Sequence, residues 1–491
     1  MSRKLPANII TYMPHEGPSV MPSPMVAPKP LLTLLPHPDK EAPPCPPRPA
    51  LPPPPKGWTS SLHAAPAAYP KGVAEAYGNL SRSSRPYESG PPPANETKEQ
   101  RKKRLYDESN RCVKLREDAY EWTIEEAKAQ APKKGQWLCV ERWRRDKPVG
   151  GATLVVTHAN GLIKEHWHVV LRDVLARDPK LPGTKFGTGL PLHHPTNIQF
   201  DDIWMIDDMN SNMSADLNGG LLGPVQLWSD DSRDFLNFVR HVLPGARALG
   251  DAPAPWHLKW TEAPDSPQPV IGMGHSFGGN GLVQASNEFP GLFSALFLVD
   301  PMCPPHTVAV GSGIAAYDLT AGALKRRDVW PSRDEARKAM RSSPFWGSWD
   351  DDTFEIWMSH GVIPLDYAKP DGPVTLAMPS WCEGAIFCEP KGFGQGWDKL
   401  ANLPFPVGFL MANKPIATLG EVVTSEMVWR PRLARVEQVT DAGHLITQEK
   451  PHTTADALWR FLTTLQAGEW GNSPEEIRKE WAVWREDRAK L

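Results

Sequence analysis

Runs of apolar residues recur along this chain and alternate with stretches of helical periodicity. Continuous apolar runs bounded by loop residues are typical of strands covered on both faces of a sheet. One stretch instead places Phe235 and Val239 a helical turn apart, and predicts an amphipathic crossover helix over residues 230–243. This alternation predicts an α/β fold with a mostly parallel, doubly covered sheet and right-handed crossovers. The predicted strands lie at 136–143, 152–157, 203–206, 269–273, 296–299, 407–411 and 434–439, and further helices at 277–289 and 452–465.

The alternation is interrupted once, and the interruption divides the predicted core. Residues 301–400 are rich in aromatic and charged side chains, including Trp346 and Trp349. We expect them to form a mainly helical cap inserted above the sheet, with most of the tryptophans packing it onto the core. The core then has two parts, 104–300 and 401–470, because the strand pattern resumes after the cap.

Proline usage separates the first 103 residues from the rest of the chain. Nearly half of the 54 prolines precede residue 95. Proline lacks a backbone donor and fixes its φ angle, so proline-dense segments do not form the interiors of helices or sheets. We therefore expect residues 1–103 to be an extended, largely disordered segment.

Charge and cysteine usage exclude several classes of protein. The net charge of −3 and a pI near 6.6 give no electrostatic case for a nucleic-acid partner. Basic residues cluster at 98–104, a segment open to two interpretations: a nuclear-import or polyanion-binding element, or a solvated helix start. The 6 cysteines show no CxxC spacing, which favours free thiols in a reducing compartment. The sequence predicts neither a membrane span nor a signal peptide.

A Gly-His-Ser-Phe-Gly sequence centred on Ser276 lies between the predicted strand at 269–273 and the helix at 277–289. A G-x-S-x-G sequence at such a junction is typical of a nucleophile elbow, where glycines permit a tight strand-to-helix turn. The turn exposes the serine hydroxyl at the carboxyl end of the sheet. We therefore predict that Ser276 is a nucleophile.

A serine hydroxyl needs a base, and the base needs an acid that orients it. His444 is the predicted base because it follows the last strand in a Gly-His turn; the alternative is that it caps the final helix. Asp300 is the predicted acid because it ends the strand that follows the elbow helix. Glu421 is the second candidate, since it is the first carboxylate after the strand at 407–411.

Acyl transfer also needs two backbone donors for the oxyanion of the tetrahedral intermediate. The N–H of Phe277, the residue after the nucleophile, is the first predicted donor. The second should come from the loop after the strand at 152–157. Leu162 is our first choice and Asn160 the second, because Gly161 lets the backbone approach closely.

The C-terminal segment, residues 471–491, ends in Ala489-Lys490-Leu491. This tripeptide is a close variant of the Ser-Lys-Leu peroxisomal address. We expect import into peroxisomes through the receptor that binds this signal, with the cytoplasm as the alternative location.

Residues 110–470 resemble the α/β-hydrolase superfamily, of the AB hydrolase-1 type. More narrowly, the chain is similar to the fungal peroxisomal branch that includes toxin-biosynthesis hydrolases and the mycophenolic acid acyl-CoA hydrolase. The resemblance implies an acid after the strand that follows the elbow, which agrees with Asp300, and also a helical cap and a peroxisomal tail. It does not cover the proline-rich segment. It rests on Thr-His-Ala-Asn-Gly at 157–161, Gly-His-Ser-Phe-Gly at 274–278, Val-Asp-Pro at 299–301 and Gly-His-Leu at 443–445.

These expectations combine into a serine hydrolase that cleaves an ester or thioester through an acyl-serine, without a cofactor or metal. The aromatic cap favours an apolar acyl group, with Met302 and Trp357 as candidate substrate contacts. The resemblance and the tail favour an acyl-CoA substrate in secondary metabolism. A carboxylesterase or lipase and a catalytically idle scaffold are the alternatives. Epoxide hydrolases and haloalkane dehalogenases are disfavoured because both use a carboxylate where this chain has Ser276.

Overall fold

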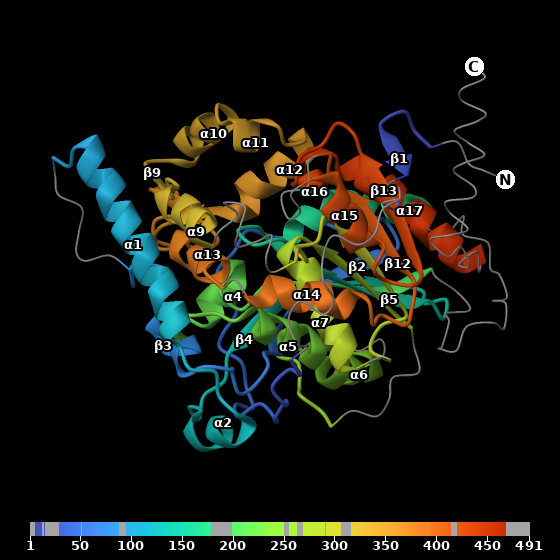
Figure 1. Ribbon diagram of the computed structural model, residues 1–491, viewed down its shortest axis with the longest axis horizontal. Coiled ribbons are helices and arrows are strands. Elements are labelled where there is room, and N and C mark those ends of the chain that lie inside the picture. The colour runs from blue at the N-terminus through green and yellow to red at the C-terminus, as the bar shows by residue number, and fades with distance from the viewer. Residues whose placement is uncertain are drawn as a thin grey trace.

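The computed structural model describes residues 5–11, 14, 29–50, 52–87, 95–177, 199–249, 255–262, 269–289, 291–305, 316–389, 391–413 and 420–467. These residues form a nine-stranded sheet with helices on both faces (Figure 1). Its order is β1-β13-β12-β8-β7-β5-β6-β4-β2, in which the strands from β13 to β6 are parallel and β1, β4 and β2 are antiparallel. The predicted fold class is confirmed. The strands are β1 (Ile9–Thr11), β2 (Trp58–Pro66), β4 (Trp137–Arg145), β5 (Ala152–Thr157), β6 (Phe200–Ile206), β7 (Val270–His275), β8 (Ala295–Val299), β12 (Val407–Met411) and β13 (Ala434–Val439).

Alternate residues of the central parallel strands pack against different helix layers, which is why a strand such as β5 is apolar along most of its length. Val155 of β5 lies in a cluster with residues of α5 and α7, whereas its neighbours Leu154 and Val156 pack with residues of α3 and α17. The predicted crossover helix at 230–243 is present but changes to a π-helical segment, η4, part of the way along. The helices of the core are α3 (Trp167–Arg177), α4 (Asn212–Leu217), α5 (Trp228–Asn237), η4 (Phe238–Val242), α6 (Leu243–Ala248), α7 (Phe277–Glu288), α15 (Glu421–Val428), α16 (Ile446–Glu449) and α17 (Pro451–Ala467).

The region between β8 and β12 forms the predicted insertion. It is helical in large part, and it also contains a short antiparallel sheet of order β10-β11-β9 that the sequence did not predict. Four of its tryptophans, including Trp346 and Trp349, form a buried cluster with Leu162 and Ile163 of the core. The elements are α9 (Ala316–Lys325), β9 (Val329–Trp330), α10 (Arg333–Arg341), α11 (Pro344–Gly347), α12 (Asp351–Ile356), η5 (Trp357–Gly361), β10 (Val362–Pro364), β11 (Val374–Leu376), α13 (Ser380–Phe387) and α14 (Lys391–Leu400).

The described part of residues 1–103 differs from the expected extended, disordered segment. It supplies both edges of the large sheet, because β1 pairs with β13 and β2 pairs with β4 along nine residues. It also contains β3 (Tyr77–Leu80) and η1 (Ala74–Ala76). The physical reason is that β2 carries no proline before its last residue, Pro66, and lies at an edge, where a strand tolerates a missing donor. Residues 1–4, 12–13, 15–28, 51 and 88–94 of this segment lie outside the described part.

Two helices, α1 (Lys98–Asp118) and α2 (Ile124–Gln130), connect this segment to the core. A capping box at Thr97 and Gln100 starts α1, so the basic cluster at 98–104 forms its first turns. The helix packs along α9 and α13 on the outside of the molecule (Figure 1). Among the described residues, the search for a helix with the length and hydropathy of a membrane span finds none.

Candidate active site

Ser276 lies at the sharp turn between β7 and α7, as predicted. Its backbone adopts a positive φ of 55°, which few residues other than glycine adopt. The flanking glycines are required for this turn. A Cβ on Gly274 would lie 2.7 Å from the Cα of Gly279, and a Cβ on Gly278 would lie 2.5 Å from the carbonyl oxygen of His158. This is the strained geometry of a nucleophile elbow.

The structure brings Ser276 together with the two predicted partners. Nε2 of His444 lies 2.9 Å from Oγ of Ser276, and Nδ1 of the same ring lies 2.5 Å from Oδ2 of Asp300. The Asp300 side chain is fully buried, and the His444 side chain retains 18% of its exposure. A hydroxyl, an imidazole and a buried carboxylate in this order form the arrangement that activates a serine nucleophile.

Adjacent parallel strands hold these residues in register. The N–H of Ser276 donates to the carbonyl of Val299 at 2.9 Å, which ties the end of β7 to the end of β8. Asp300 follows β8 with a positive φ of 37°, and its N–H donates to the carbonyl of Leu410 in β12. The N–H of Ala412 donates to Oδ1 of Asp300 at 3.3 Å. The carboxylate is therefore oriented by the next strand while its other oxygen faces His444.

Glu421, the second candidate for the acid, is the first residue of α15. Both ring nitrogens of His444 already have partners, one in Asp300 and one in Ser276. The ring has no third nitrogen for Glu421 to engage. The geometry therefore favours Asp300 over Glu421.

The two loops predicted to bind an oxyanion meet beside Ser276, since Gly278 touches His158 at the end of β5. The N–H of Phe277 opens α7 and therefore lies among the helix donors without an intrahelical acceptor. Our first choice for the second donor, Leu162, stays a prediction, although its N–H donates to the carbonyl of Ala159 at 3.1 Å and closes a turn. The N–H of Asn160 makes no such bond among the described residues, so the geometry favours our second choice.

A buried ionic network, which the sequence analysis missed, holds the loop that follows β5. This loop, residues 158–162, is called the oxyanion loop below because it is predicted to bind the oxyanion. Nζ of Lys164 lies 2.6 Å from Glu165 and 2.7 Å from Asp207, and the N–H of Lys164 also donates to Asp207. Asn212 donates to the carboxylates of both Glu165 and Asp207. The loop after β5 is therefore tied to the end of β6. Adjacent Lys164 and Glu165 on an apolar segment were the signal available in the sequence.

Two buried histidines position the site without contacting its nucleophile. His158 donates from Nδ1 to the carbonyl of Ala159 and accepts at Nε2 from the N–H of Asp208. Burial lowers the pKa of His158 to about 4. His275 donates from Nε2 to the carbonyl oxygen of His444 at 2.9 Å, and burial holds its pKa well below the usual value. Both rings are therefore neutral at pH 7 and act as fixed hydrogen-bonding groups.

The remaining predicted site residues have different locations. Met302 lies next to the nucleophile, because its N–H donates to the carbonyl of Ser276 at 3.0 Å. Trp357 is buried in the insertion, where it stacks on His166 and packs against Trp349. A role of either in substrate contact stays a prediction. The tail Ala489-Lys490-Leu491 lies outside the described residues.

One group of side chains outside the Ser276 arrangement could offer ligands to a metal ion. Asp350, Asp352 and His452 offer ligand atoms that lie within 4.8 Å of one another. His452 also pairs with Asp173 at 2.7 Å. Exposed acidic groups of this kind are common without an ion, and these residues take no part in the Ser276 arrangement.

Comparison with known proteins gives relatives by sequence and by structure. The search of protein-family models finds no match. A type I acyl-CoA thioesterase, mpaH, of Penicillium brevicompactum is 28% identical over 201 residues, covering 40% of this chain and 38% of the relative. The matched region thus spans well under half of that protein. The abhydrolase domain-containing protein AKT2 of Alternaria alternata is 26% identical over 243 residues, covering 44% of this chain and 90% of the relative.

Among solved structures, the peroxisomal alpha-beta-hydrolase Lpx1 of Saccharomyces cerevisiae is similar with a TM-score of 0.54 and 15% identity. The alignment covers 89% of this chain and 98% of the yeast protein. At this identity the likeness establishes the shared fold.

Proposed function

The chain belongs to the α/β-hydrolase superfamily and to the fungal branch of its abhydrolase and acyl-CoA thioesterase relatives, and from that premise we propose that it is a serine hydrolase. It cleaves an ester or thioester through an acyl-serine intermediate. The observation that carries this proposal is the continuous hydrogen-bonded series from Ser276 through His444 to Asp300.

In this mechanism Oγ of Ser276 attacks the carbonyl carbon of the acyl group while Nε2 of His444 takes its proton. Asp300 stabilises the resulting imidazolium through Nδ1. The N–H groups of Phe277 and Asn160 bind the oxyanion of the tetrahedral intermediate. Collapse expels the alcohol or thiol with the proton from His444, and a water molecule, deprotonated by the same imidazole, then releases the acid and restores the serine.

The leaving group we propose is the thiol of coenzyme A. Two observations support a thioester: mpaH is named a type I acyl-CoA thioesterase, and the C-terminal tripeptide resembles a peroxisomal address. The apolar residues of the insertion favour an apolar acyl group.

Initial rates on octanoyl-CoA and on p-nitrophenyl octanoate test the proposal, with Ser276→Ala as the control. We expect a higher kcat/KM for the thioester and loss of both activities in Ser276→Ala. A preference for the simple ester would instead assign a carboxylesterase. A fluorophosphonate probe adds a second readout: a folded protein whose Ser276 is not labelled is an idle scaffold.

We also propose that the protein acts in peroxisomes and is carried there by the import receptor for this tripeptide. A fluorescent fusion that keeps the C-terminus free should colocalise with a peroxisomal marker, and deletion of Ala489-Lys490-Leu491 should leave it in the cytosol. Unchanged location after the deletion would refute this part of the proposal.

A further inference from the structure

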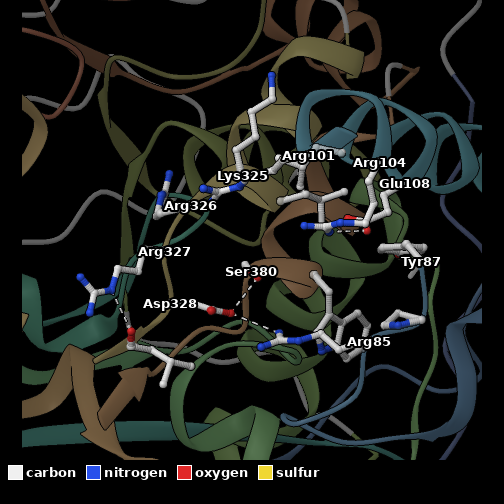
Figure 2. Close-up of a pocket in the computed structure, with 15 residues that line it drawn as sticks. Arg85, Tyr87, Arg101, Arg104, Glu108, Lys325, Arg326, Arg327, Asp328 and Ser380 are labelled. Atoms are coloured by element: carbon white, nitrogen blue, oxygen red, sulfur yellow. Dashed lines mark hydrogen bonds and ion pairs between the residues drawn. The ribbon is translucent and has the colours of Figure 1, made fainter. Parts of the chain in front are cut away.

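A strongly basic pocket lies between α1, α9 and α13, outside the Ser276 arrangement (Figure 2). Its volume of about 440 Å³ falls in the range typical of small-molecule sites. The carboxylates in its lining are Glu108 and Asp328. The cationic residues in its lining are Arg85, Arg101, Arg104, Lys325, Arg326 and Arg327.

The described residues neutralise only part of this positive charge. Arg104 is held between Glu96 and Glu108, both at 2.8 Å. Arg85 lies 3.2 Å from Asp328, which also accepts from Ser380 (Figure 2).

By contrast, no carboxylate in the described part of the chain forms an ion pair with Arg101, Lys325 or Arg327. Arg327 donates from Nε only to the carbonyl of Val329. All three side chains are exposed, so they can turn toward an anion. The pocket therefore has an excess of positive charge suited to more than one phosphate group.

The rest of the lining is aromatic and apolar. Tyr87 and Trp381 are both buried in the wall, beside Leu105 and Leu324. The Trp381 indole N–H has no acceptor among the described residues. Flat apolar walls next to cationic groups suit a nucleotide, whose base stacks or packs while its phosphates bind the arginines.

One residue joins this pocket to the oxyanion loop. Arg326 of the pocket lies 2.8 Å from the carboxylate of Glu383 in α13. The same carboxylate lies against Gly161, where an added Cβ would be 2.7 Å from its Oε1. The carbonyl of Glu383 accepts from the side chain of Asn160 at 3.1 Å. The pocket wall and the loop predicted to bind the oxyanion are therefore connected through Glu383.

We propose that this pocket binds the phosphates of the adenosine end of an acyl-CoA substrate while the thioester reaches Ser276. The proposal rests on the acyl-CoA hydrolase function proposed above and adds the residues that select that leaving group. Of the two interpretations of the basic start of α1, the polyanion-binding one then applies. Arg101, Lys325 and Arg327 are the specificity-determining residues of the pocket.

The test compares a thioester that carries the phosphates with one that lacks them: octanoyl-CoA and octanoyl-N-acetylcysteamine. The variant is the triple substitution Arg101→Gln, Lys325→Gln and Arg327→Gln. The matched control removes the same charge from three exposed lysines of α1 that do not line the pocket, Lys102→Gln, Lys103→Gln and Lys114→Gln.

We expect the pocket variant to raise KM for octanoyl-CoA by about tenfold or more, since each lost charge-assisted contact weakens phosphate binding. Its kcat, and its kinetics on the N-acetylcysteamine thioester, should stay unchanged, and the control should behave as the wild type. A KM for octanoyl-CoA within about twofold of the wild type would overturn the proposal.

Calorimetric titration with adenosine 3′,5′-bisphosphate separates this proposal from the activity itself. Binding to the wild type that is lost in the pocket variant supports the site even if neither thioester is hydrolysed, an outcome that would refute only the acyl-CoA hydrolase function. Equal binding to both proteins, or binding of inorganic phosphate or an acidic peptide but not of the nucleotide, would overturn the site.

Discussion

Asp300 accepts a 2.5 Å hydrogen bond from His444, although 144 residues separate them in the chain. An Asp300→Asn substitution keeps the shape but loses the charge that favours the required tautomer and the imidazolium form of His444. We expect kcat to fall by about 10⁴-fold, the effect of this change in a comparable triad. Steady-state kinetics with Glu421→Gln as the control check the assignment. Near-normal activity in Asp300→Asn together with an inactive Glu421→Gln would reverse it.

Gly161 provides a second test, because two separate features of its position require glycine. Its φ is +82°, and an added Cβ would meet the carboxylate of Glu383. We expect Gly161→Ala to displace the neighbouring Asn160 N–H and lower kcat by about tenfold to a hundredfold, with a smaller effect on KM. Gly150→Ala is the matched control, since Gly150 also has a positive φ, of +73°, but faces open space.

Backbone strain should lower the free energy of unfolding of both variants by about 1–2 kcal/mol, and the contact of the new Cβ with Glu383 adds to the loss in Gly161→Ala. Only Gly161→Ala should change kcat. Equal activity of the two variants would show that the loop position is not critical to oxyanion binding.

The sequence predicted those strands whose own residues carry a recognisable hydrophobic pattern. β5, β12 and β13 begin and end at the predicted residues, because β5 and β12 are largely apolar runs and the first four residues of β13 alternate apolar with charged side chains. β2 was missed because its stability comes from pairing with β4, and its small and polar residues carry no strand pattern of their own. The cap strands β9 to β11 are two or three residues long, too short to show a period.

The same distinction applies to the site. Ser276, His444 and Asp300 could be predicted because each follows a recognisable strand at the carboxyl edge of the sheet, where parallel strands bring their ends together. The choice between Leu162 and Asn160 depended on one turn hydrogen bond, to Ala159, which no sequence pattern reveals. The contact of Glu383 with Asn160 and Gly161 could not be predicted, because it depends on how the insertion packs on the core.

Asp208 gives a pH-dependent prediction. Its two carboxylate oxygens are buried without a hydrogen-bond partner among the described residues, and burial, with Asp207 and Asp234 nearby, raises its pKa well above the usual value. The folded protein therefore keeps a proton that the unfolded chain loses above about pH 4. The free energy of unfolding then falls as pH rises between the unfolded and folded pKa values.

An Asp208→Asn variant lacks this titration. We expect its free energy of unfolding to gain on that of the wild type by about 1.4 kcal/mol per pH unit above pH 4, up to the folded pKa. Urea unfolding at pH 5, 6 and 7 measures the difference. Asp118→Asn, on the exposed surface of α1, is the control that should parallel the wild type, and parallel curves for Asp208→Asn would contradict the prediction.

The N-terminal segment provides the last prediction, which concerns the edge strand β2. This strand is bonded on both sides: to β4 along its length, and through Ala64 to the backbone of Trp256 and Leu258. A chain that starts at residue 67 leaves the hydrogen-bonding edge of β4 unpaired. We expect this chain to aggregate or unfold, because the loss approaches the whole stability of a domain, about 5–15 kcal/mol. A chain that starts at residue 29 loses, among the described residues, β1 and the flanking contacts of Leu5 and Asn8, and should remain folded with a lower unfolding midpoint. Size-exclusion chromatography and thermal unfolding distinguish the two, and a monomeric chain from residue 67 with an unchanged midpoint would show that β2 is dispensable.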